Sequence, residues 1–361
     1  MIIQIMIIMT TNFSKNIIRT LFALLIICLP NLGNTMFGRD GNLVLLQSLE
    51  GRWQFSIGMN DEWTSAKFND TSWESIRVPS PWEDEGYNGY NGYAFYRKKI
   101  TISSKYKDRM LYLNMGYIDD VDEVYLNGKK IGSTGSFPPN YSTAYNAERV
   151  YYIPVEYINF DGPNLIAVKV YDSEQEGGIV SGDIGLYGGK NAVNMDINLQ
   201  SSWKFQPGDD LRRKEPDFDD EGWDEIFVPG KWENQGYRDY DGYAWYRKSF
   251  VFKTTGETEK MVLLMGKIND IDQVYINGTF VGSTGTFPTR PGAKANVGEQ
   301  YKAFRGYYIP DGLLKKNEKN VIAVRVLDVG GDGGIYEGPV GLITQTKYID
   351  YWRKLKKEGD E

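Results

Sequence analysis

The chain has 361 residues, which is enough for roughly two domains. Its apolar share of 41% and charged share of 25% are those of an ordinary soluble globular protein. A net charge of −7 argues against the basic surface that nucleic-acid binding requires, and it disfavours binding to an anionic membrane. The sequence has no histidine, which excludes Ser-His-Asp and Cys-His catalysis and histidine-ligated zinc.

The first 35 residues differ from the rest of the chain. Lys15 and Arg19 precede the apolar run of residues 20–29, and small residues follow it. This order is typical of a secretory signal peptide, and the run is too short to span a bilayer. A start at Met9 would give a cleaner signal. We therefore expect residues 1–35 to be removed, leaving a soluble protein that is exported, most simply to the periplasm.

Cys28, the only cysteine, allows a second interpretation of this segment. Lipidation of Cys28 would make the protein a surface lipoprotein. The preceding residues 25–27 lack the small side chain that usually stands before a lipidated cysteine, which favours cleavage instead. The mature chain would then contain no thiol, so we expect neither disulfides nor cysteine–metal sites.

The rest of the chain is a duplication, with each copy spanning about 150 residues, the size of a domain. The offset between the copies is 150 residues, and it becomes 156 after an insertion in the second copy. Matched pairs include Trp53 and Trp203, Asp70 and Asp220, Trp82 and Trp232, Arg97 and Arg247, Asp120 and Asp270, Asn127 and Asn277, Phe137 and Phe287, Tyr151 and Tyr307, and Gly177 and Gly333.

The periodicity within each copy is that of β-strands. Ile166, Val168 and Val170 alternate with other residues, which is typical of a half-buried strand. Asn127-Gly128 and Asn277-Gly278 predict two-residue hairpins. We expect an all-β protein with two tandem β-sandwich domains of the jelly-roll type, over residues 36–193 and 194–346. A short polar tail, residues 347–361, would follow, with a helical pattern over 348–357.

The repeated motifs carry a family resemblance. Asp70-x-x-Trp73, Val78-Pro79-x-x-Trp82-Glu83, Tyr96-Arg97-Lys98 and Val124-Tyr125-x-Asn127-Gly128 recur in the second copy. They resemble the N-terminal sugar-binding domain of glycoside hydrolase family 2, a galactose-binding-like jelly roll that is also attached to sialate O-acetylesterases. That family hydrolyses glycosides with two glutamates on a separate (β/α)₈ barrel. Here a second jelly roll stands in the barrel's place, so the catalytic assignment does not transfer.

An aromatic loop in each copy is the first candidate for a ligand site. Aromatic rings can stack on the C–H face of a sugar, and carboxylates can bind its hydroxyls. The alternative is that the tryptophans plug the end of the sandwich and the tyrosines pack the loop. The candidate residues are Trp82, Glu83, Tyr87, Tyr90 and Tyr93, with Trp232, Glu233, Tyr237, Tyr240 and Tyr243 in the second copy.

The second candidate is an acidic, glycine-rich turn in each copy. It carries Asp172 and Glu176 in the first copy, and Asp328 and Asp332 in the second. Oxygen-rich turns suit sugar hydroxyls or a structural Ca²⁺, although the spacing is not that of an EF-hand. The alternative is a solvated turn. Beyond this, the sequence calls for no cofactor.

The basic residues divide into two groups. We expect Arg97 and Arg247 to pair internally, with aspartates such as Asp120 or Asp122 and their counterparts. The second group lies in the loop of residues 288–306, whereas the corresponding loop, 138–150, is neutral and aromatic. If these loops flank the two sites, the second copy would favour an anionic glycan. The basic residues of the longer loop are Arg290, Lys294, Lys302 and Arg305.

The leading hypothesis is a non-catalytic carbohydrate-binding accessory protein of a polysaccharide-degrading system, with one shallow site in each repeat. Its partners would be a poly- or oligosaccharide and the enzymes that degrade it. One alternative is a family 2-related hydrolase or lyase that uses carboxylates or tyrosines. The other is a scaffold that binds protein. The sequence names neither the sugar nor its linkage.

Overall fold

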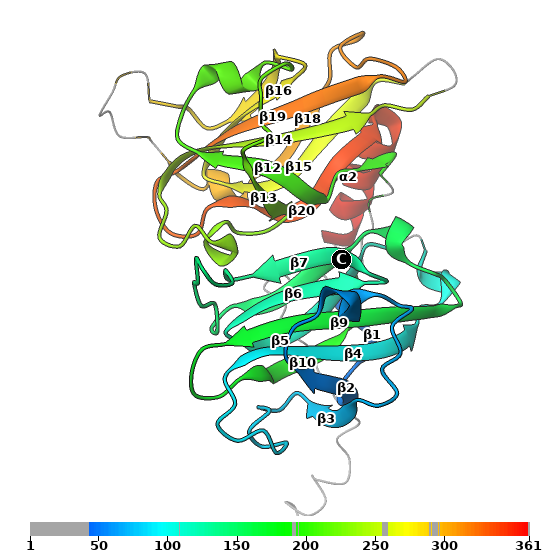
Figure 1. Ribbon diagram of the computed structural model, residues 1–361. Coiled ribbons are helices and arrows are strands. Elements are labelled where there is room, and N and C mark those ends of the chain that lie inside the picture. Colours follow the sequence, from blue (N-terminus) through cyan, green and yellow to red (C-terminus); the bar gives the residue numbers. More distant parts are fainter. Residues whose placement is uncertain are drawn as a thin grey trace, which may run out of the picture. The chain divides into compact units, whose positions relative to one another are not determined.

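The computed structural model describes residues 43–359 apart from 108, 190–192, 194, 255–258, 289, 291–294 and 296. The predicted signal peptide, residues 1–35 with Cys28, lies outside the described residues. The described chain folds into four antiparallel sheets, which form two sandwiches of the same design (Figure 1). Each sandwich has one six-stranded and one four-stranded sheet. The predicted all-β class with two repeated sandwiches is confirmed.

In the first repeat, the six-stranded sheet has the order β3-β2-β4-β9-β6-β7 and the four-stranded sheet has the order β1-β10-β5-β8. From β4 onward the chain passes repeatedly between the two sheets, as in a jelly roll. The strands are β1 (Leu43–Ser48), β2 (Gly51–Ile57), β3 (Glu74–Val78), β4 (Gly92–Thr101), β5 (Leu111–Asp119), β6 (Val121–Leu126), β7 (Lys129–Thr134), β8 (Glu148–Ile153), β9 (Pro163–Asp172) and β10 (Gly178–Gly189).

The second repeat has the same strand order, with β13-β12-β14-β19-β16-β17 in the larger sheet and β11-β20-β15-β18 in the smaller one. Its strands are β11 (Ile197–Asn198), β12 (Ser201–Pro207), β13 (Asp224–Val228), β14 (Gly242–Val251), β15 (Met261–Asn269), β16 (Ile271–Ile276), β17 (Thr279–Thr284), β18 (Phe304–Tyr308), β19 (Lys319–Asp328) and β20 (Gly334–Thr344).

The inward-facing side chains of each pair of sheets form one hydrophobic core per repeat. Ile166, Val168 and Val170 on β9 are fully buried, but Ala167 between them is 0% exposed as well, so this part of β9 is covered on both faces and is not half-buried as predicted. Trp53 and Trp203 occupy equivalent places in the two cores. Burial of these apolar faces against each other is the main source of stability of each sandwich.

The two predicted hairpins are present. Asn127 and Gly128 have φ angles of 52° and 78° between β6 and β7. Asn277 and Gly278 have φ angles of 50° and 81° between β16 and β17. Positive φ at both turn positions is what a two-residue hairpin requires, and Asn-Gly provides it with the least strain.

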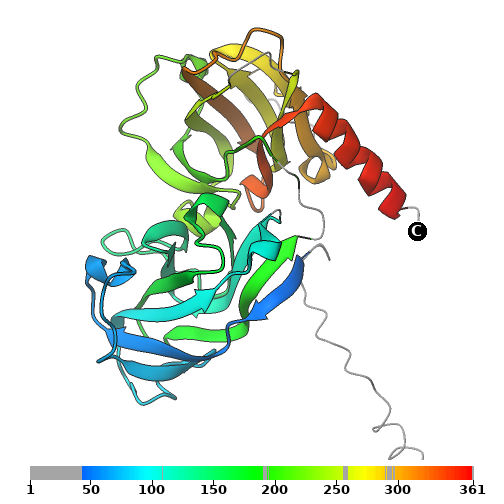
Figure 2. The same ribbon diagram turned by 90° about the vertical axis from the view of Figure 1, so that its right-hand side faces the viewer.

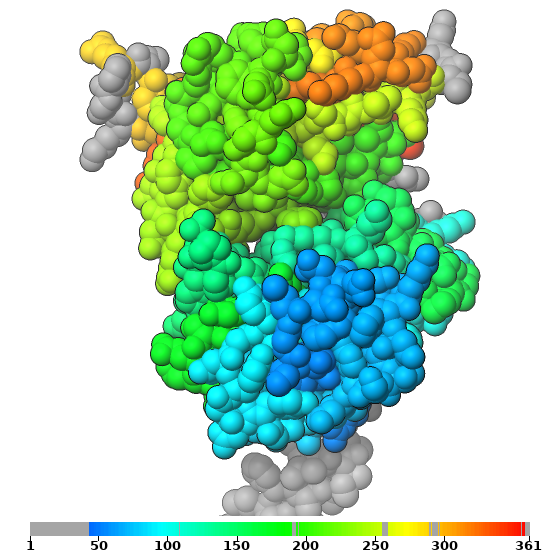
Figure 3. Space-filling view, viewed as in Figure 1, coloured from blue at the N-terminus to red at the C-terminus, as the bar shows by residue number. Residues whose placement is uncertain are grey.

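Arg97 and Arg247 pair internally, but with aspartates other than the predicted ones. The Arg97 Nε donates to Asp70 over 2.8 Å, and the Arg247 Nε donates to Asp220 over 2.6 Å. Each guanidinium also donates to backbone carbonyls of the segment that carries its aspartate. In the first repeat this segment, residues 58–73, therefore covers the outer face of the six-stranded sheet; it is the blue surface facing the viewer in Figure 3.

The C-terminal segment is an amphipathic helix, α2 (Gln345–Gly359), which begins directly after β20. Figure 2 shows α2, in red, extending from the second repeat. Its Tyr348 and Trp352 pack around Phe304 of β18, with the Phe304 and Trp352 ring centres 5.4 Å apart. Among the described residues α2 is the only α-helix, so this part of the chain contains no (β/α)₈ barrel. None of the helices there is long and apolar enough to cross a membrane.

Candidate ligand-binding site

The aromatic loop and the acidic turn, which were predicted separately, lie against each other in the first repeat. The Trp82 N–H donates to the carbonyl of Gly177 over 3.0 Å, and the Gly177 N–H donates to a carboxylate oxygen of Glu83 over 3.1 Å. A Cβ on Gly177 would lie 2.2 Å from the Trp82 ring, so a larger residue cannot fit without a shift. Glu83 and Trp82 thus tie the loop to the turn.

The second repeat joins the same two segments in the same way. The Trp232 N–H donates to the carbonyl of Gly333 over 3.3 Å, and the Gly333 N–H donates to Glu233 over 2.8 Å. A Cβ on Gly333 would lie 2.1 Å from the Trp232 ring. Burial raises the pKa of Glu233 to about 7, opposed by its backbone hydrogen bonds and reinforced by the charges of Asp328 and Asp332.

The two tryptophans of the loops belong to the cores. Trp82 and Trp232 are both 0% exposed. Their ring N–H groups donate to the backbone carbonyls of Tyr90 and Tyr240 over 3.1 Å. A ring without exposed surface offers no face to a ligand, so we correct their assignment from sugar contacts to plugs of the sandwich end, which was the alternative interpretation.

Most of the loop tyrosines also support the loop itself. The hydroxyls of Tyr87 and Tyr237 donate to the carboxylates of Glu74 and Asp224, and all four tyrosines at 87, 90, 237 and 240 pack against the cores. The hydroxyls of Tyr90 and Tyr240 donate to the carbonyls of Tyr93 and Tyr243. Tyr93 and Tyr243 are half-buried and are not part of these cores, so they remain the loop residues best placed for a ligand.

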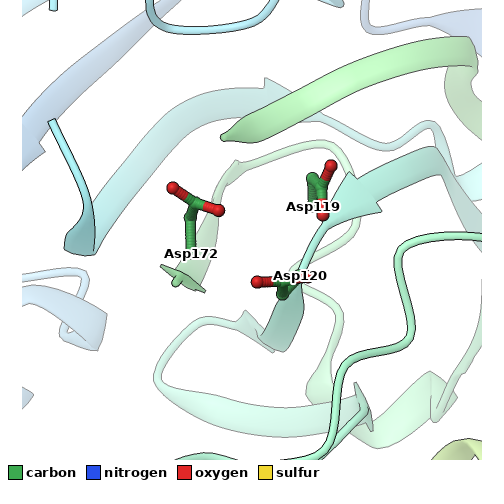
Figure 4. Close-up of side chains that lie close together, drawn as sticks. All are labelled: Asp119, Asp120 and Asp172. Carbon is green, nitrogen blue, oxygen red and sulfur yellow. The ribbon is translucent and has the colours of Figure 1, made fainter. Parts of the chain in front are cut away.

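Three carboxylates meet at the end of the first sandwich. Asp119 ends β5, Asp120 follows it before β6, and Asp172 ends β9. Carboxylate oxygens of the three residues lie within 4.8 Å of one another, and Figure 4 shows the side chains grouped together. Asp172 was predicted from the turn, whereas the sequence analysis did not single out Asp119 or assign a ligand role to Asp120.

The local environment moves the pKa values of these carboxyls in opposite directions. Burial raises the pKa of Asp119 to about 7, and the neighbouring Asp120 and Asp172 charges add to it. Burial likewise raises the pKa of Asp172 to about 7. Burial also acts on Asp120, but hydrogen bonds from Thr143, Tyr141 and Ser173 outweigh it and hold the pKa of Asp120 below its ordinary value. Asp120 therefore loses its proton at a lower pH than Asp119 and Asp172 do.

An aromatic group lies beside the three aspartates. Tyr93 stacks on Phe137 with ring centres 5.9 Å apart, and it contacts Tyr171 at 4.8 Å. Tyr141 contacts Tyr171 at 5.7 Å, and its hydroxyl donates to Asp120 over 2.5 Å. The Tyr141 residue is 38% exposed. The aromatic character of loop 138–150 was the sequence signal that pointed to Tyr141.

The second repeat keeps part of this arrangement. Tyr243 stacks on Phe287 at 6.0 Å, and Asp270 and Asp328 take the places of Asp120 and Asp172. Leu327 replaces Tyr171, and Asn269 replaces Asp119. Burial raises the pKa of Asp328 to about 7, helped by the charges of Asp270 and Asp241. The aspartates are thus retained while the aromatic group is smaller.

The remaining acidic residues of the two turns lie apart from these clusters. Glu176 is exposed. Asp332 pairs with Lys231, and its side chain is 52% exposed. Among the described residues, the group of carboxylates within 4.8 Å of one another includes Asp172 and does not include Glu176 or Asp332. A ligand role for the two turns stays a prediction.

The basic loop of the second repeat is less available than its sequence suggests. Arg305 is buried, and its Nε donates to Asp272 over 2.9 Å. Lys302 pairs with Glu299 at 2.7 Å. Lys294 lies outside the described residues, and Arg290 is exposed. Arg305 is thus a structural counterpart of Arg149, which pairs with Asp122 at 2.8 Å, and we remove it from the predicted ligand contacts.

Comparison with known proteins relates these repeats to parts of larger glycosidases. A beta-galactosidase of Priestia megaterium is 27% identical over 199 residues, which are 44% of this chain and 18% of that protein. A putative beta-glucuronidase of Formosa agariphila is 27% identical over 136 residues, covering 34% of this chain and 12% of that one. The chain therefore spans less than a fifth of the length of either relative.

Among solved structures, a beta-glucuronidase of Bacteroides uniformis shares 17% identity with a TM-score of 0.35, over 78% of this chain and 27% of that one. The family model of the beta-galactosidase second all-beta domain matches residues 59–176 and again residues 209–332. These two matches cover more than half of the sequence. The chain belongs to the family of the beta-galactosidase second all-beta domain, of which it contains two copies.

Proposed function

We propose that the protein binds glycans without hydrolysing them, through the end of each sandwich where the aromatic loop meets the acidic turn. The observation that carries this proposal is the group formed by Tyr93, Tyr141 and Tyr171 beside Asp119 and Asp172 in the first repeat. Membership in a domain family of beta-galactosidases supports a glycan context. The finer likeness to the family 2 sugar-binding domain belongs to the same proposal.

The chemistry of the group suits a sugar. A tyrosine face packs against the apolar C–H face of a pyranose, and carboxylates accept hydrogen bonds from neighbouring hydroxyls. One shallow site of this kind gives a Kd of roughly micromolar to millimolar. Two sites on one polymer would raise the apparent affinity by a factor of about 10² or more if both engage at once. Duplication then has a physical benefit.

A glycan array on the intact chain tests the proposal, followed by affinity measurements on the best ligand. We expect Tyr141→Ala to weaken binding about tenfold, because it removes an exposed ring and the hydroxyl that contacts Asp120. Phe280→Ala is the matched control, since Phe280 is also an exposed aromatic residue but lies on β17 of the second repeat. Equal affinity of Tyr141→Ala and the unmodified chain would contradict the site.

One observation favours the enzymatic alternative. Asp119 and Asp120 are neighbours whose pKa values move in opposite directions, which is the pattern of an acid and a base. Product analysis on the glycans that bind separates the two functions. Turnover that Asp119→Asn abolishes would establish hydrolysis, and retention of intact glycan would support binding alone. Capture of a protein partner without any glycan retention would favour a scaffold.

The cellular setting is also part of the proposal. The pattern of residues 1–35 supports export to the periplasm, where the protein would act beside polysaccharide-degrading enzymes. Cell fractionation and N-terminal sequencing of the mature chain test this. A product that begins after residue 35 and lies in the periplasmic fraction is expected, whereas a lipid-modified Cys28 would place the protein on a membrane surface instead.

A further inference from the structure

A cleft lies where the two repeats meet. Both repeats belong to one compact unit, and the Gly135 N–H of the first donates to the carbonyl of Asn234 in the second over 2.7 Å. The cleft has a volume of about 520 Å³, within the range of roughly 300–1,000 Å³ that is usual for small-molecule sites. Its walls come from β7, β8 and the short helix η3 (Val155–Tyr157) of the first repeat and from β11 to β14 of the second. Neither repeat forms the cleft alone.

A buried amide donor in this cleft has no hydrogen-bond partner. Gln200 lines the cleft and is 3% exposed. Its Oε1 accepts from the Val340 N–H over 3.3 Å, whereas its Nε2 makes no hydrogen bond. A buried donor without an acceptor is costly, because it has given up its hydrogen bonds to water. An oxygen of a ligand in the cleft would remove that cost.

The nearest side-chain oxygen in the cleft is already engaged. Burial and the charge of Glu156 raise the pKa of Tyr152 to about 12, and the amides of Asn198 and Gln200 oppose this rise, so the Gln200 amide lies near the Tyr152 hydroxyl. That hydroxyl oxygen accepts from the Asn198 side-chain amide. Its own proton and the Gln200 Nε2 are therefore two donors that a ligand can share.

Comparison with the first repeat shows that the sandwich framework does not demand a buried amide at this position. Glu50 is the equivalent of Gln200, and it is exposed. The unpaired donor is therefore a feature of the cleft and not of the fold.

The charged side chains of the cleft favour an uncharged ligand. They are two cations, Lys130 and Lys248, and two anions, Glu156 and Glu225. Lys130 and Glu225 form ion pairs within the chain at 2.6 and 3.2 Å, and the Lys248 Nζ donates to the Ser201 hydroxyl over 2.8 Å. The opposite charges balance, and most of them have partners, so the cleft offers no net charge to an ionic ligand.

The apolar part of the cleft is largely aromatic. Tyr152, Tyr157, Phe227 and Phe250 line it, and all four are half-buried. Aromatic rings pack against the apolar C–H face of a sugar, while its hydroxyl oxygens accept hydrogen bonds. Rings beside two neutral donors therefore suit an uncharged sugar.

We propose that the cleft between the repeats binds an uncharged sugar unit, whose oxygen accepts from the Gln200 Nε2 while the aromatic side chains pack against its C–H face. The cleft shares no lining residue with the sandwich ends described above. Its ligand binding can therefore fail without affecting the proposed function, and the reverse also holds. Duplication of the domain creates a site that a single copy lacks.

Titration of the full chain with two neutral disaccharides, cellobiose and lactose, tests the proposal by NMR. The side-chain amide signals of Gln200 are identified by their absence in Gln200→Glu. We expect them to shift at millimolar sugar, both in the unmodified chain and in Tyr141→Ala, which removes the proposed contact at the sandwich end. Glucuronate at the same concentration should leave them in place. A shift with a soluble neutral β-glucan would identify a unit within a polymer as the ligand, and a response to the disaccharides alone would identify a free sugar or a chain end.

Two valine variants locate the response. Val150 lies on β8 and lines the cleft, and Val44 lies on β1 of the same sheet outside the cleft; both are exposed. Val150→Trp should abolish the shift because the indole fills the cleft, whereas Val44→Trp should respond as the unmodified chain does. Hydrogen exchange of the unmodified chain is a readout that needs no variant, and residues 197–202 should exchange more slowly with sugar present.

Three results would overturn the proposal. One is the absence of both a shift and a change in exchange at about 50 mM of either disaccharide, well above the Kd expected for a shallow site. Another is an equal response of Val150→Trp and Val44→Trp, which would place the sugar elsewhere. The third is a larger shift with glucuronate, which would assign the cleft to an anion.

Discussion

The two repeats share the ion pairs and ring contacts of their interiors and differ most at the ends of their sandwiches. In both, an arginine and a tyrosine share one buried aspartate: Arg149 and Tyr151 with Asp122, and Arg305 and Tyr307 with Asp272. In both, a tryptophan packs on a glycine of the turn. These contacts are interior, and a change in one partner there leaves a cavity or an unpaired charge.

The end of each sandwich shows the opposite behaviour. Tyr171 becomes Leu327, Asn91 becomes Asp241, and the loop after Phe287 is longer than the loop after Phe137. Lys169 sits over the Phe137 ring, while Arg325 sits over the Phe287 ring. Asn91 and Asp241 are exposed, whereas Leu327 and the side chains of Lys169 and Arg325 are largely buried, so these exchanges are not confined to the surface. The comparison indicates that both copies keep the same interior ion pairs and ring contacts, while the residues at the sandwich ends differ between them.

The buried arginine pairs give the strongest test of this equivalence. We expect Arg149→Met and Arg305→Met each to lower the free energy of unfolding by about 3–5 kcal/mol, because each leaves a fully buried aspartate without its cation. Urea denaturation of the single variants measures the loss. Arg52→Met is the control, since Arg52 pairs with Glu85 but its side chain is 66% exposed. Losses in the free energy of unfolding below 1 kcal/mol in both variants, or losses that differ severalfold between the repeats, would contradict the expectation that the two buried ion pairs are equivalent.

The Arg97–Asp70 and Arg247–Asp220 ion pairs should contribute unequally to the stability of the two repeats. The Asp70 side chain is 7% exposed, whereas that of Asp220 is 28% exposed. We expect Asp70→Asn to cost about 1.5–3 kcal/mol at pH 7, as it removes a charge-assisted hydrogen bond from buried Arg97. Asp220→Asn should cost less, because water reaches that carboxylate.

The pH dependence of the Asp70→Asn effect follows from the direction of its pKa shift. Burial alone would raise the pKa of Asp70, but the hydrogen bond and charge of Arg97 hold it below its ordinary value. The folded state therefore binds this proton less readily than the unfolded chain does, and the stabilisation is present above the unfolded pKa. As pH falls through the folded pKa, the gap between the unmodified chain and Asp70→Asn should close. A gap that widens in acid would contradict the assignment.

Much of the fold was predictable because the same local motifs occur in both copies. The repeated Asn-Gly pairs predict the hairpins, since only a few residue types accept positive φ at both turn positions. The alternation of Ile166, Val168 and Val170 predicts β9, because one face of a sheet must be buried. The all-β class follows from these local signals, each of which needs no knowledge of distant contacts.

The candidate site was predictable only in part, because it depends on which strand ends meet. Asp119 and Asp172 are 53 residues apart, and β5 and β9 belong to different sheets, so periodicity alone does not bring them together. The partner of Arg97 was missed for the same reason, as Asp70 lies on a segment that folds back over the sheet. The tryptophans were ambiguous, since an aromatic residue beside glycines suits both a core plug and an exposed stacking platform.

The tryptophan–glycine contacts should respond alike in the two repeats. Gly177→Ala and Gly333→Ala would each place a Cβ about 2 Å from an indole ring, which forces the ring or the turn to move. We expect each change to lower the free energy of unfolding by about 1–3 kcal/mol. Gly222→Ala is the control, because a Cβ there meets nothing within 4 Å. Urea denaturation midpoints check all three, and a loss in only one repeat would show that the loops are not held equally.

The smallest expected effect on stability concerns Lys169 and Arg325, the cations over the aromatic pairs. We expect substitutions of these two residues to have different costs in the two repeats. Arg325 donates to both oxygens of Asp209 and to Gln273, while Lys169 donates to one oxygen of Glu123 over 3.3 Å. Lysine cannot reproduce the planar fork of arginine, so Arg325→Lys should cost about 1 kcal/mol, whereas Lys169→Arg should stay within about 0.5 kcal/mol. Denaturation curves of the two reciprocal variants measure this. Equal costs would mean that the ring beneath each cation, rather than its carboxylate partner, sets the energy of the contact.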